Sequence, residues 1–243
     1  MIAVIVPIYN TEKYLRETID SVICQTLSFA EHIRLILLDD ASTDGSFAIC
    51  EQYQKQYPKQ ILVKHYDTNQ GVSVLRNEGV RIAGEMGDEL ITFLDSDDKL
   101  ADDAMEKAKM YFESHEDISV AAIAVKYFGT RDGEQRLNWR FQEMDVVDIK
   151  KQYTFPHYYV GGVFLRKRVL NELHFDETMN FWEDALAINQ VIVSEGKYGL
   201  IQDTFYFYRK REDESSLVDT AWHKKERYTT PVSYTHLTLP TTE

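Results

Sequence analysis

Residues 91–100, ITFLDSDDKL, combine the end of an apolar run with three carboxylates in four positions. The apolar and β-branched residues from Leu90 to Leu94 predict a strand that is buried on both faces. Asp95, Asp97 and Asp98 follow this strand directly. Carboxylates so close together repel one another unless a positive group lies among them. The stretch therefore predicts a buried strand whose end binds a cation.

Apolar runs that end in polar residues recur through the first hundred residues, and helical patterns separate them. The strands predicted in this way are Ala3–Pro7, His32–Leu38, Ile61–His65 and Leu90–Leu94. Continuously apolar strands that alternate with amphipathic helices are typical of a parallel sheet with helices on both faces. Ligands bind outside the carboxyl ends of such strands. We therefore expect Asp39 and Asp40, after the second strand, to face the same crevice as the acidic stretch at 95–98.

The second half of the chain has a less regular pattern. Its predicted elements are a helix at about Asp102–Ser114, strands at Val120–Phe128, Val163–Arg166 and Thr204–Arg209, and a helix from Phe181 to about Ser194. The polar residues 129–145 are expected to form a loop with hairpin character. No linker or repeat divides the chain, so we expect one domain over residues 1–228. Residues 229–243 are rich in Thr and lack periodicity, which predicts a non-native or disordered tail.

The composition excludes several classes of protein. The chain has 27 Lys and Arg against 40 Asp and Glu, a net charge of −13, so it lacks the surplus of cations that a general nucleic-acid binder needs. An acidic chain can still bind one phosphorylated ligand if a metal ion compensates the charge. No apolar run approaches the ~20 residues of a membrane span and no signal peptide is recognisable, so we expect a cytoplasmic protein. Cys24 and Cys50 show no CxxC spacing and are expected to be reduced core residues.

Several motifs, in this order and at this spacing, carry a resemblance to a known family. They are VPIYNTEKYLRETIDSVICQT, LLDDASTDGS, NQGVSVLRNEGV, ITFLDSDD, FWEDALAINQVI and FYRKREDESS. Together they resemble the family-2 inverting glycosyltransferases with the GT-A fold, of the type that builds bacterial polysaccharides. The resemblance implies an α/β fold in which a mostly parallel, Rossmann-like central sheet is flanked by helices. It also implies a nucleotide-sugar half at residues 1–100 and a smaller acceptor half at 101–228.

The resemblance also assigns roles to single residues. Family members use a nucleotide-diphosphate sugar as the donor, which we expect here to be a UDP-sugar. Asp40 matches the carboxylate that binds the base, Asp95 is expected near the ribose, and Asp97 is expected to hold a divalent metal, Mn²⁺ or Mg²⁺, between the two phosphates. Asp184 matches the catalytic base. The other residues expected to contact the donor are Pro7, Tyr9, Asn10, Asn69, Arg76, Ser96 and Arg209.

The implied chemistry is a direct displacement at the anomeric carbon of the sugar, which inverts its configuration. As general base, Asp184 would take the proton of the acceptor hydroxyl, an effect worth roughly 10²–10⁴-fold in rate. A hard cation at Asp97 would bind carboxylate and phosphate oxygen together and neutralise the leaving diphosphate. The expected acceptor is a glycan or lipid-linked glycan in capsule, lipopolysaccharide or exopolysaccharide synthesis. Lys224, Lys225 and Arg227 are candidates for a peripheral contact with the inner face of the membrane.

Each of these roles has a structural alternative that the sequence leaves open. Asp40 could simply cap the next helix, and Asp184 could be an ordinary acid in the first turn of a helix. Arg76 could be a salt-bridged scaffold residue rather than a donor contact. Phe181 and Trp182 could pack in the core or form a platform for an acceptor sugar.

Rival functions lack the residues they need. A calcium loop of the EF-hand type requires Gly at its sixth position, where this chain has Leu100. A nicotinamide dehydrogenase requires a Gly-rich loop after the first strand, as would a sugar-nucleotide pyrophosphorylase, and this chain has PIYNTEKY there. The remaining alternative is a nucleotide-binding but catalytically silent protein of the same fold. Turnover of a donor, as opposed to its binding, separates that alternative from an enzyme.

Overall fold

The computed structural model describes residues 1–152, 157, 159–179 and 181–211. The strands are β1 (Ile2–Ile8), β2 (Ile33–Asp39), β3 (Ile61–His65), β4 (Leu90–Phe93), β5 (Lys99–Leu100), β6 (Val120–Gly129), β7 (Gly133–Glu134), β8 (Val146–Asp148), β9 (Val163–Arg166) and β10 (Lys197–Lys210). The helices are α1 (Glu12–Ile23), α2 (Phe29–His32), α3 (Ser46–Gln56), α4 (Val72–Met86), α5 (Ala104–Ser114), α6 (Arg140–Glu143) and α7 (Glu183–Glu195).

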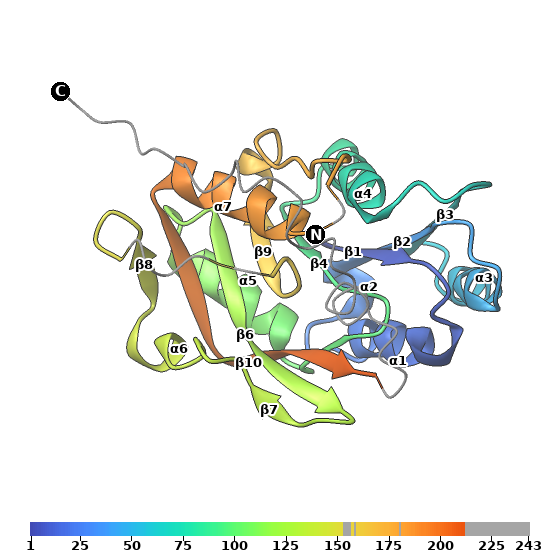
Figure 1. Ribbon diagram of the computed structural model, residues 1–243, viewed down its shortest axis with the longest axis horizontal. Helices are drawn as coiled ribbons and strands as arrows, with labels where there is room; N and C mark the ends of the chain where they lie inside the picture. The colour runs from blue at the N-terminus through green and yellow to red at the C-terminus, as the bar shows by residue number, and fades with distance from the viewer. Residues whose placement is uncertain (153–156, 158, 180, 212–243) are drawn as a thin grey trace, which may run out of the picture.

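All these strands belong to one sheet, in the order β3-β2-β1-β4-β9-β6-β10-β5, with β7 paired to β6 and β8 paired to β10 (Figure 1). The first four strands of this order are parallel, as are β6 and β10. The short strand β9 is antiparallel to both of its neighbours. The prediction of a mostly parallel central sheet flanked by helices is therefore confirmed.

The parallel pairing brings the carboxyl ends of the first strands to one edge of the sheet. Ile8 at the end of β1 lies opposite Asp39 at the end of β2, and Asp39 lies opposite His65 at the end of β3. β4 runs parallel to β1 and leads into the acidic stretch at 95–98. The segments that follow β1, β2 and β4 therefore share this edge, as the sequence predicts.

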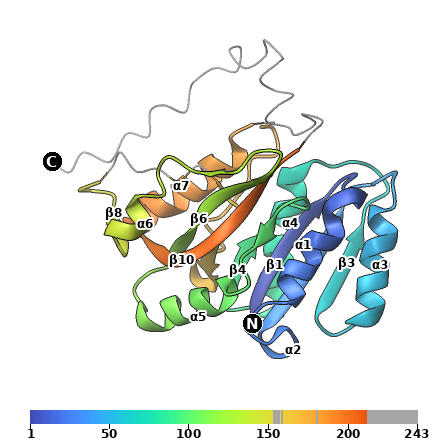
Figure 2. The ribbon, with the colours of Figure 1, turned by 90° about the horizontal axis from the view of Figure 1, so that it is seen from below.

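The helices cover both faces of the sheet because successive strand residues point to opposite sides. In β1, Val4 and Val6 pack in one apolar cluster with Leu15 of α1, whereas Ile5 packs in the other with Leu75 of α4. Residues of α3 and α5 belong to the first cluster, and residues of α7 belong to the second. Figure 2, seen from below, shows α1 in front of the sheet and α4 behind it.

Close packing at Gly79 fixes the position of α4 on the sheet. A Cβ atom at Gly79 would lie 2.3 Å from Cγ2 of Ile5 in β1, closer than two such carbon atoms can approach. The absence of a side chain therefore lets the helix lie directly on the strand. Arg76 lies one turn earlier on the same helix, so this contact also sets the depth at which its side chain enters the carboxyl edge.

Strand β10 is longer than the sequence predicts. The predicted strand covers Thr204–Arg209, whereas the observed strand covers Lys197–Lys210 and pairs with β6 along most of its length. The register between the two strands shifts between Ile201 and Phe205, and Asp203 has a φ of 56°. This irregularity interrupts the apolar pattern, which is why the first half of the strand was missed.

Smaller corrections concern helix ends and one cysteine. The last helix begins at Glu183 rather than Phe181, because Trp182 has a left-handed φ of 66° that a helix cannot contain. Cys24 is exposed, contrary to the prediction of a core residue, because it lies at the C-cap of α1 beyond the buried face; Cys50 is buried as predicted. The hairpin predicted within 129–145 is present, since β7 pairs antiparallel with β6.

Two predictions concern membranes and the end of the chain. Among the described residues, none of the helices combines the length and the apolar character needed to cross a membrane. The basic residues Lys224, Lys225 and Arg227, and the predicted tail at 229–243, lie outside the residues that the structure describes.

Candidate active site

The loop after β1 is bonded to the loop after β2 at the carboxyl edge. The backbone N–H of Asn10 donates to Ser42 Oγ at 3.0 Å, and the Asn10 side-chain oxygen accepts the backbone N–H of Thr43 at 2.8 Å. Asn10 has a φ of 52°, which Asn tolerates better than most residues. Pro7 is buried in β1, whereas Tyr9 is 50% exposed. Of the predicted nucleoside contacts, Tyr9 thus has a ring open to a ligand, and Asn10 maintains the shape of the loop.

Asp40 is buried and bonds the backbone of the two residues that precede α4. Its carboxylate accepts the backbone N–H groups of Gln70 at 2.6 Å and Gly71 at 2.9 Å. Gly71 has a φ of 92°, a conformation that favours glycine. The Asn69 side-chain amide lies 3.4 Å from the Asp40 carbonyl oxygen. Asp40 therefore supports the loop before α4, and not α3, the next helix in the chain, whose capping the sequence leaves open. The second lone pair of each carboxylate oxygen can still accept a bond from a nucleotide base.

Arg76 connects two acidic motifs from opposite halves of the chain. It is 5% exposed, and its guanidinium donates to Asp95 Oδ1 at 3.1 Å and to Glu183 Oε1 at 2.9 Å. Burial alone would lower the pKa of Arg76, but the surrounding carboxylates, Asp95 first among them, raise it. The scaffold role considered for Arg76 is thus present in the structure. Through these bonds, Glu183, the residue before Asp184, is connected by the Arg76 side chain to Asp95 in the acidic stretch after β4.

The backbone of the acidic stretch is fixed by Tyr206 of β10. The buried Tyr206 hydroxyl donates to Asp98 Oδ2 at 2.7 Å and accepts the backbone N–H of Asp95 at 3.1 Å. A Cβ atom at Gly161 would lie 2.4 Å from this ring, so only glycine leaves room for it. From the other side, Thr18 of α1 donates to the carbonyl oxygens of Ser96 and Asp98. Ser96 is itself buried and contributes its backbone to this support.

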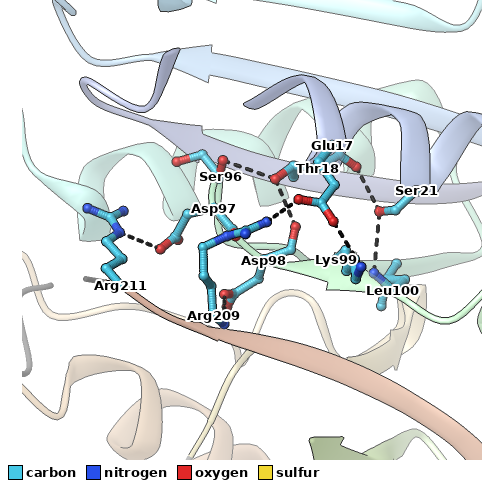
Figure 3. Close-up of polar contacts among 10 residues, drawn as sticks. All are labelled: Glu17, Thr18, Ser21, Ser96, Asp97, Asp98, Lys99, Leu100, Arg209 and Arg211. Atoms are coloured by element: carbon cyan, nitrogen blue, oxygen red, sulfur yellow. Dashed lines mark hydrogen bonds and ion pairs between the residues drawn. The ribbon is translucent and has the colours of Figure 1, made fainter. Parts of the chain in front are cut away.

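Two arginines from the end of β10 bind the acidic stretch in different ways (Figure 3). Arg209 donates its backbone N–H to Asp98 Oδ1 at 2.7 Å, its Nε to the Asp97 carbonyl oxygen at 2.6 Å, and its guanidinium to Glu17. Arg211 instead donates Nε to the Asp97 carboxylate, Oδ2, at 2.7 Å. Arg209, predicted to contact the donor, is therefore bonded to protein groups here, and Arg211 is the cation that contacts the predicted metal ligand.

The carboxylate repulsion predicted from the sequence is present in the structure. Burial raises the pKa of Asp97, and the charge of Asp95 raises it further, although the ion pair with Arg211 lowers it. Burial raises the pKa of Asp98 well above its usual range, and the charges of Asp97 and Asp95 add to this effect. A divalent cation at this edge would relieve that repulsion.

The ligand set at this edge is incomplete for a metal ion held by protein alone. Among the residues that the structure describes, no group of three or more His, Cys, Asp or Glu is placed to hold a metal. Asp97 offers hard carboxylate oxygens, and Mg²⁺-type sites typically combine one or two carboxylates with substrate phosphates and water. The residues therefore fit a divalent cation that binds together with a diphosphate.

Asp184 is half-buried in the first turn of α7, the element whose start Arg76 contacts. Its carboxylate accepts the backbone N–H of Ala185 at 2.7 Å. Burial raises the pKa of Asp184 to about 6; the positive charge of Arg76 opposes this rise, and the negative charge of Glu183 adds to it. A carboxyl group that ionises near the working pH has the property required of a general base.

With Asp184 as the expected base, its raised pKa predicts an acid limb in the pH profile of the expected sugar transfer. A base must be ionised to act, so kcat/KM should rise with pH up to about 6 and then level off. Glu183→Gln should move this limb to lower pH, because the Glu183 charge raises the Asp184 pKa. Initial rates between pH 4.5 and 8 measure the acid limb of the wild type and that of Glu183→Gln. If the acid limb has the same pKa in Glu183→Gln as in the wild type, the limb belongs to a group other than Asp184.

Tyr206→Phe is expected to loosen the acidic stretch. The change leaves one oxygen of the buried Asp98 without its donor, which should lower the free energy of unfolding by about 1–3 kcal/mol. The expected metal-dependent affinity for UDP should fall with it, since the Asp95 N–H also loses its acceptor. Tyr111→Phe is the control, because the buried Tyr111 hydroxyl also donates a hydrogen bond, but to the Asp145 carbonyl oxygen rather than to the acidic stretch. Denaturant unfolding and calorimetry would compare the variants, and equal effects of the two would contradict the assignment.

Sequence reasoning missed the residues that support the site from β10. Tyr206 reads as one more aromatic residue in a strand, and its partners lie more than a hundred positions away. Asp98 read as a third negative charge, although it is the group that ties the acidic stretch to β10. A signal in the sequence could have indicated Tyr206: the pair Gly161 and Gly162 beside a buried strand. Close packing of a backbone against a large ring requires glycine.

Comparisons with known proteins agree with this architecture. The family model of Glycosyl transferase family 2 matches residues 3–174. The minor teichoic acid biosynthesis protein GgaA of Bacillus subtilis is 40% identical over 241 residues, which are 98% of this chain and 54% of that protein. This chain therefore spans about half the length of that curated relative.

Solved structures share the fold. A crystal structure of residues 1–349 of S. aureus TarS in complex with UDP-GlcNAc has a TM-score of 0.75 at 25% identity, covering 87% of this chain and 59% of that one. The mannosyltransferase PcManGT from Pyrobaculum calidifontis, in complex with GDP-Man and Mn²⁺, has a TM-score of 0.68 at 17% identity, covering 91% and 61%. At that identity the second likeness shows the fold alone. With the family model matched over most of its described length and the GT-A fold in place, the chain belongs to glycosyl transferase family 2.

Proposed function

We propose that the chain is a metal-dependent, inverting glycosyltransferase that moves a sugar from a UDP-sugar to a hydroxyl group of a glycan or lipid-linked glycan. The observation that carries the proposal is the position of Arg76, which bonds Asp95 on the donor side and Glu183, the neighbour of Asp184, on the base side. A single buried side chain thus holds the proposed donor site and the proposed base next to each other. Displacement at one carbon atom requires that proximity.

The relatives support the choice of substrates. TarS, solved with UDP-GlcNAc, shares the fold at 25% identity, which favours a uridine nucleotide as the donor. GgaA, at 40% identity, is described by its role in minor teichoic acid biosynthesis, which favours a cell-surface glycopolymer as the acceptor. We propose that the reaction takes place in the cytoplasm or at the inner face of the membrane, where such donors are made.

The residues of the chain divide the work between binding and proton transfer. Tyr9 and Asp40 contact the nucleoside, and Asp95 contacts the ribose. Asp97 would hold Mn²⁺ or Mg²⁺, which would supply positive charge to compensate the diphosphate. Asp184 accepts the proton of the acceptor hydroxyl while that oxygen attacks the anomeric carbon from the face opposite the diphosphate. Attack in line with the leaving group inverts the configuration, so an α-linked donor gives a β-linked product.

Donor turnover tests the proposal against the catalytically silent alternative. The protein would be incubated with UDP-glucose, UDP-galactose, UDP-GlcNAc and UDP-GalNAc, with and without Mn²⁺, and release of UDP would be followed in the absence and presence of cell-wall glycan fractions. We expect release with one of these donors that requires Mn²⁺ and increases with the acceptor. Binding of UDP without turnover of any donor would favour the silent alternative.

A further inference from the structure

The guanidinium of Arg211 bonds Asp97, the carboxylate proposed as the metal ligand. Nε of Arg211 lies 2.7 Å from Oδ2 of Asp97, and both side chains are 16% exposed. In Figure 3 the Arg211 side chain points directly at this carboxylate. A divalent cation binds a carboxylate oxygen at about 2.0–2.2 Å, so it competes with an arginine for the same lone pairs. Even a cation on the other oxygen, Oδ1, would lie close enough to be repelled by the guanidinium.

The neighbouring arginine is held differently, which singles out Arg211 as the group that can exchange. Arg209 lies within β10 and its side chain bonds the Asp97 carbonyl oxygen and Glu17 rather than a carboxylate of the acidic stretch. Arg211 follows Lys210, the last residue of β10, so its backbone lies beyond the paired part of the strand. Its guanidinium also lies 5.2 Å from the centroid of the Tyr14 ring, which Arg209 contacts as well, at 4.8 Å.

We propose that Arg211 is an internal counter-ion that replaces the metal on Asp97 when no donor is bound, and that it transfers to the donor diphosphate when the metal and the nucleotide arrive together. The proposal rests on the proposed function, since it requires a divalent cation and a diphosphate at this edge. The exchange keeps Asp97 paired in both states. The exchange also couples the binding of metal and nucleotide. When the Arg211 guanidinium leaves Asp97, it donates to phosphate oxygens, for which its planar shape is well suited.

Mn²⁺ titrations of Arg211→Gln test the exchange directly. Without nucleotide, the variant should bind Mn²⁺ at least about fivefold more tightly than the wild type, because its competitor is gone. With saturating UDP, the same variant should bind Mn²⁺ more weakly than the wild type, because the diphosphate has lost an arginine. Water-proton relaxation of Mn²⁺ measures both affinities without any turnover. A residue that merely supports the fold would weaken binding in both conditions.

Two further variants control for charge and folding. Lys210→Gln removes the same formal charge one position away, where the ammonium lies over the rings of Tyr127 and Tyr208, and should change Mn²⁺ affinity by less than about twofold. Arg211→Lys keeps the charge, and its affinity for Mn²⁺ should lie between that of the wild type and that of Arg211→Gln.

The outcomes separate this inference from the proposed function. If the wild type binds UDP with Mn²⁺ and Arg211→Gln leaves the affinity for Mn²⁺ alone unchanged or lower, the counter-ion role is wrong and the proposed function stands. If the wild type shows no Mn²⁺-dependent binding of UDP, the proposed function fails and the exchange fails with it. Opposite changes in the two titrations would support the exchange.

Discussion

Replacing Asp97 with Asn is expected to lower the affinity for UDP in the presence of Mn²⁺ by at least about 100-fold. Loss of an outer partner of a metal ligand already costs roughly 10–100-fold in metal affinity, and Asp97 is the proposed ligand itself. In the structure its carboxylate is bonded by Arg211, the group with which a metal ion would compete for it. UDP affinity without Mn²⁺ should be low in both proteins, because little then compensates the charge of the diphosphate.

Isothermal calorimetry with UDP, in the presence of Mn²⁺ and of a chelator, measures this difference. Asp102→Asn is the matched control, since Asp102 is an exposed carboxylate five positions along the chain and its loss changes the net charge equally. Unchanged Mn²⁺-dependent affinity in Asp97→Asn, with a normal unfolding transition, would overturn the metal assignment.

Asp184→Asn should abolish sugar transfer while leaving UDP binding intact. The amide keeps the shape of the side chain but cannot take a proton, so the rate should fall by roughly 10²–10⁴-fold. Donor binding should persist because Asp184 lies on α7, and the proposed donor contacts come from the loops after β1, β2 and β4.

Stability provides the control for this variant. The pKa of Asp184 is raised to about 6 in the folded protein, so the folded state holds the proton more tightly than the unfolded state. The stabilisation from this group is therefore complete below the unfolded pKa of about 4 and is lost as pH rises through about 6. At pH 7.5 the amide removes the cost of a buried charge, so the melting temperature should not fall. Transfer retained in a well-folded variant would assign the base to another residue.

The sequence predicted that the ends of β1, β2 and β4 lie at one edge because their arrangement follows from the sheet. Continuously apolar strands separated by helices imply parallel pairing, and parallel pairing brings the carboxyl ends of β1, β2 and β4 to one edge. Asp40 and Asp95 could therefore be assigned to the same crevice from the sequence alone. The pattern could not show that Asp40 bonds Gln70 and Gly71, because that contact depends on how the loop before α4 folds back.

Contacts between distant segments account for what the sequence could not predict. The bonds of Arg76 join residues from the two halves of the chain, and no periodicity reports on such a pair. Arg211 was one of several cations near the end of a predicted strand, and only its distance of 2.7 Å to Asp97 distinguishes it. The irregular register of β10 concealed how far this strand extends and hence which of its residues support the acidic stretch.

The most direct measurement of the central claim is a thermal-shift panel of UDP, GDP, CDP and ADP, each with and without Mn²⁺. A ligand that binds only the folded state stabilises it by RT ln(1 + [L]/Kd), which raises the melting temperature. The account predicts a clear rise with UDP that requires Mn²⁺, and smaller or no rises with the other nucleotides. No rise with any nucleotide, or an equal rise with UDP when the metal is chelated, would contradict the assignment of the acidic edge as a metal-dependent nucleotide site.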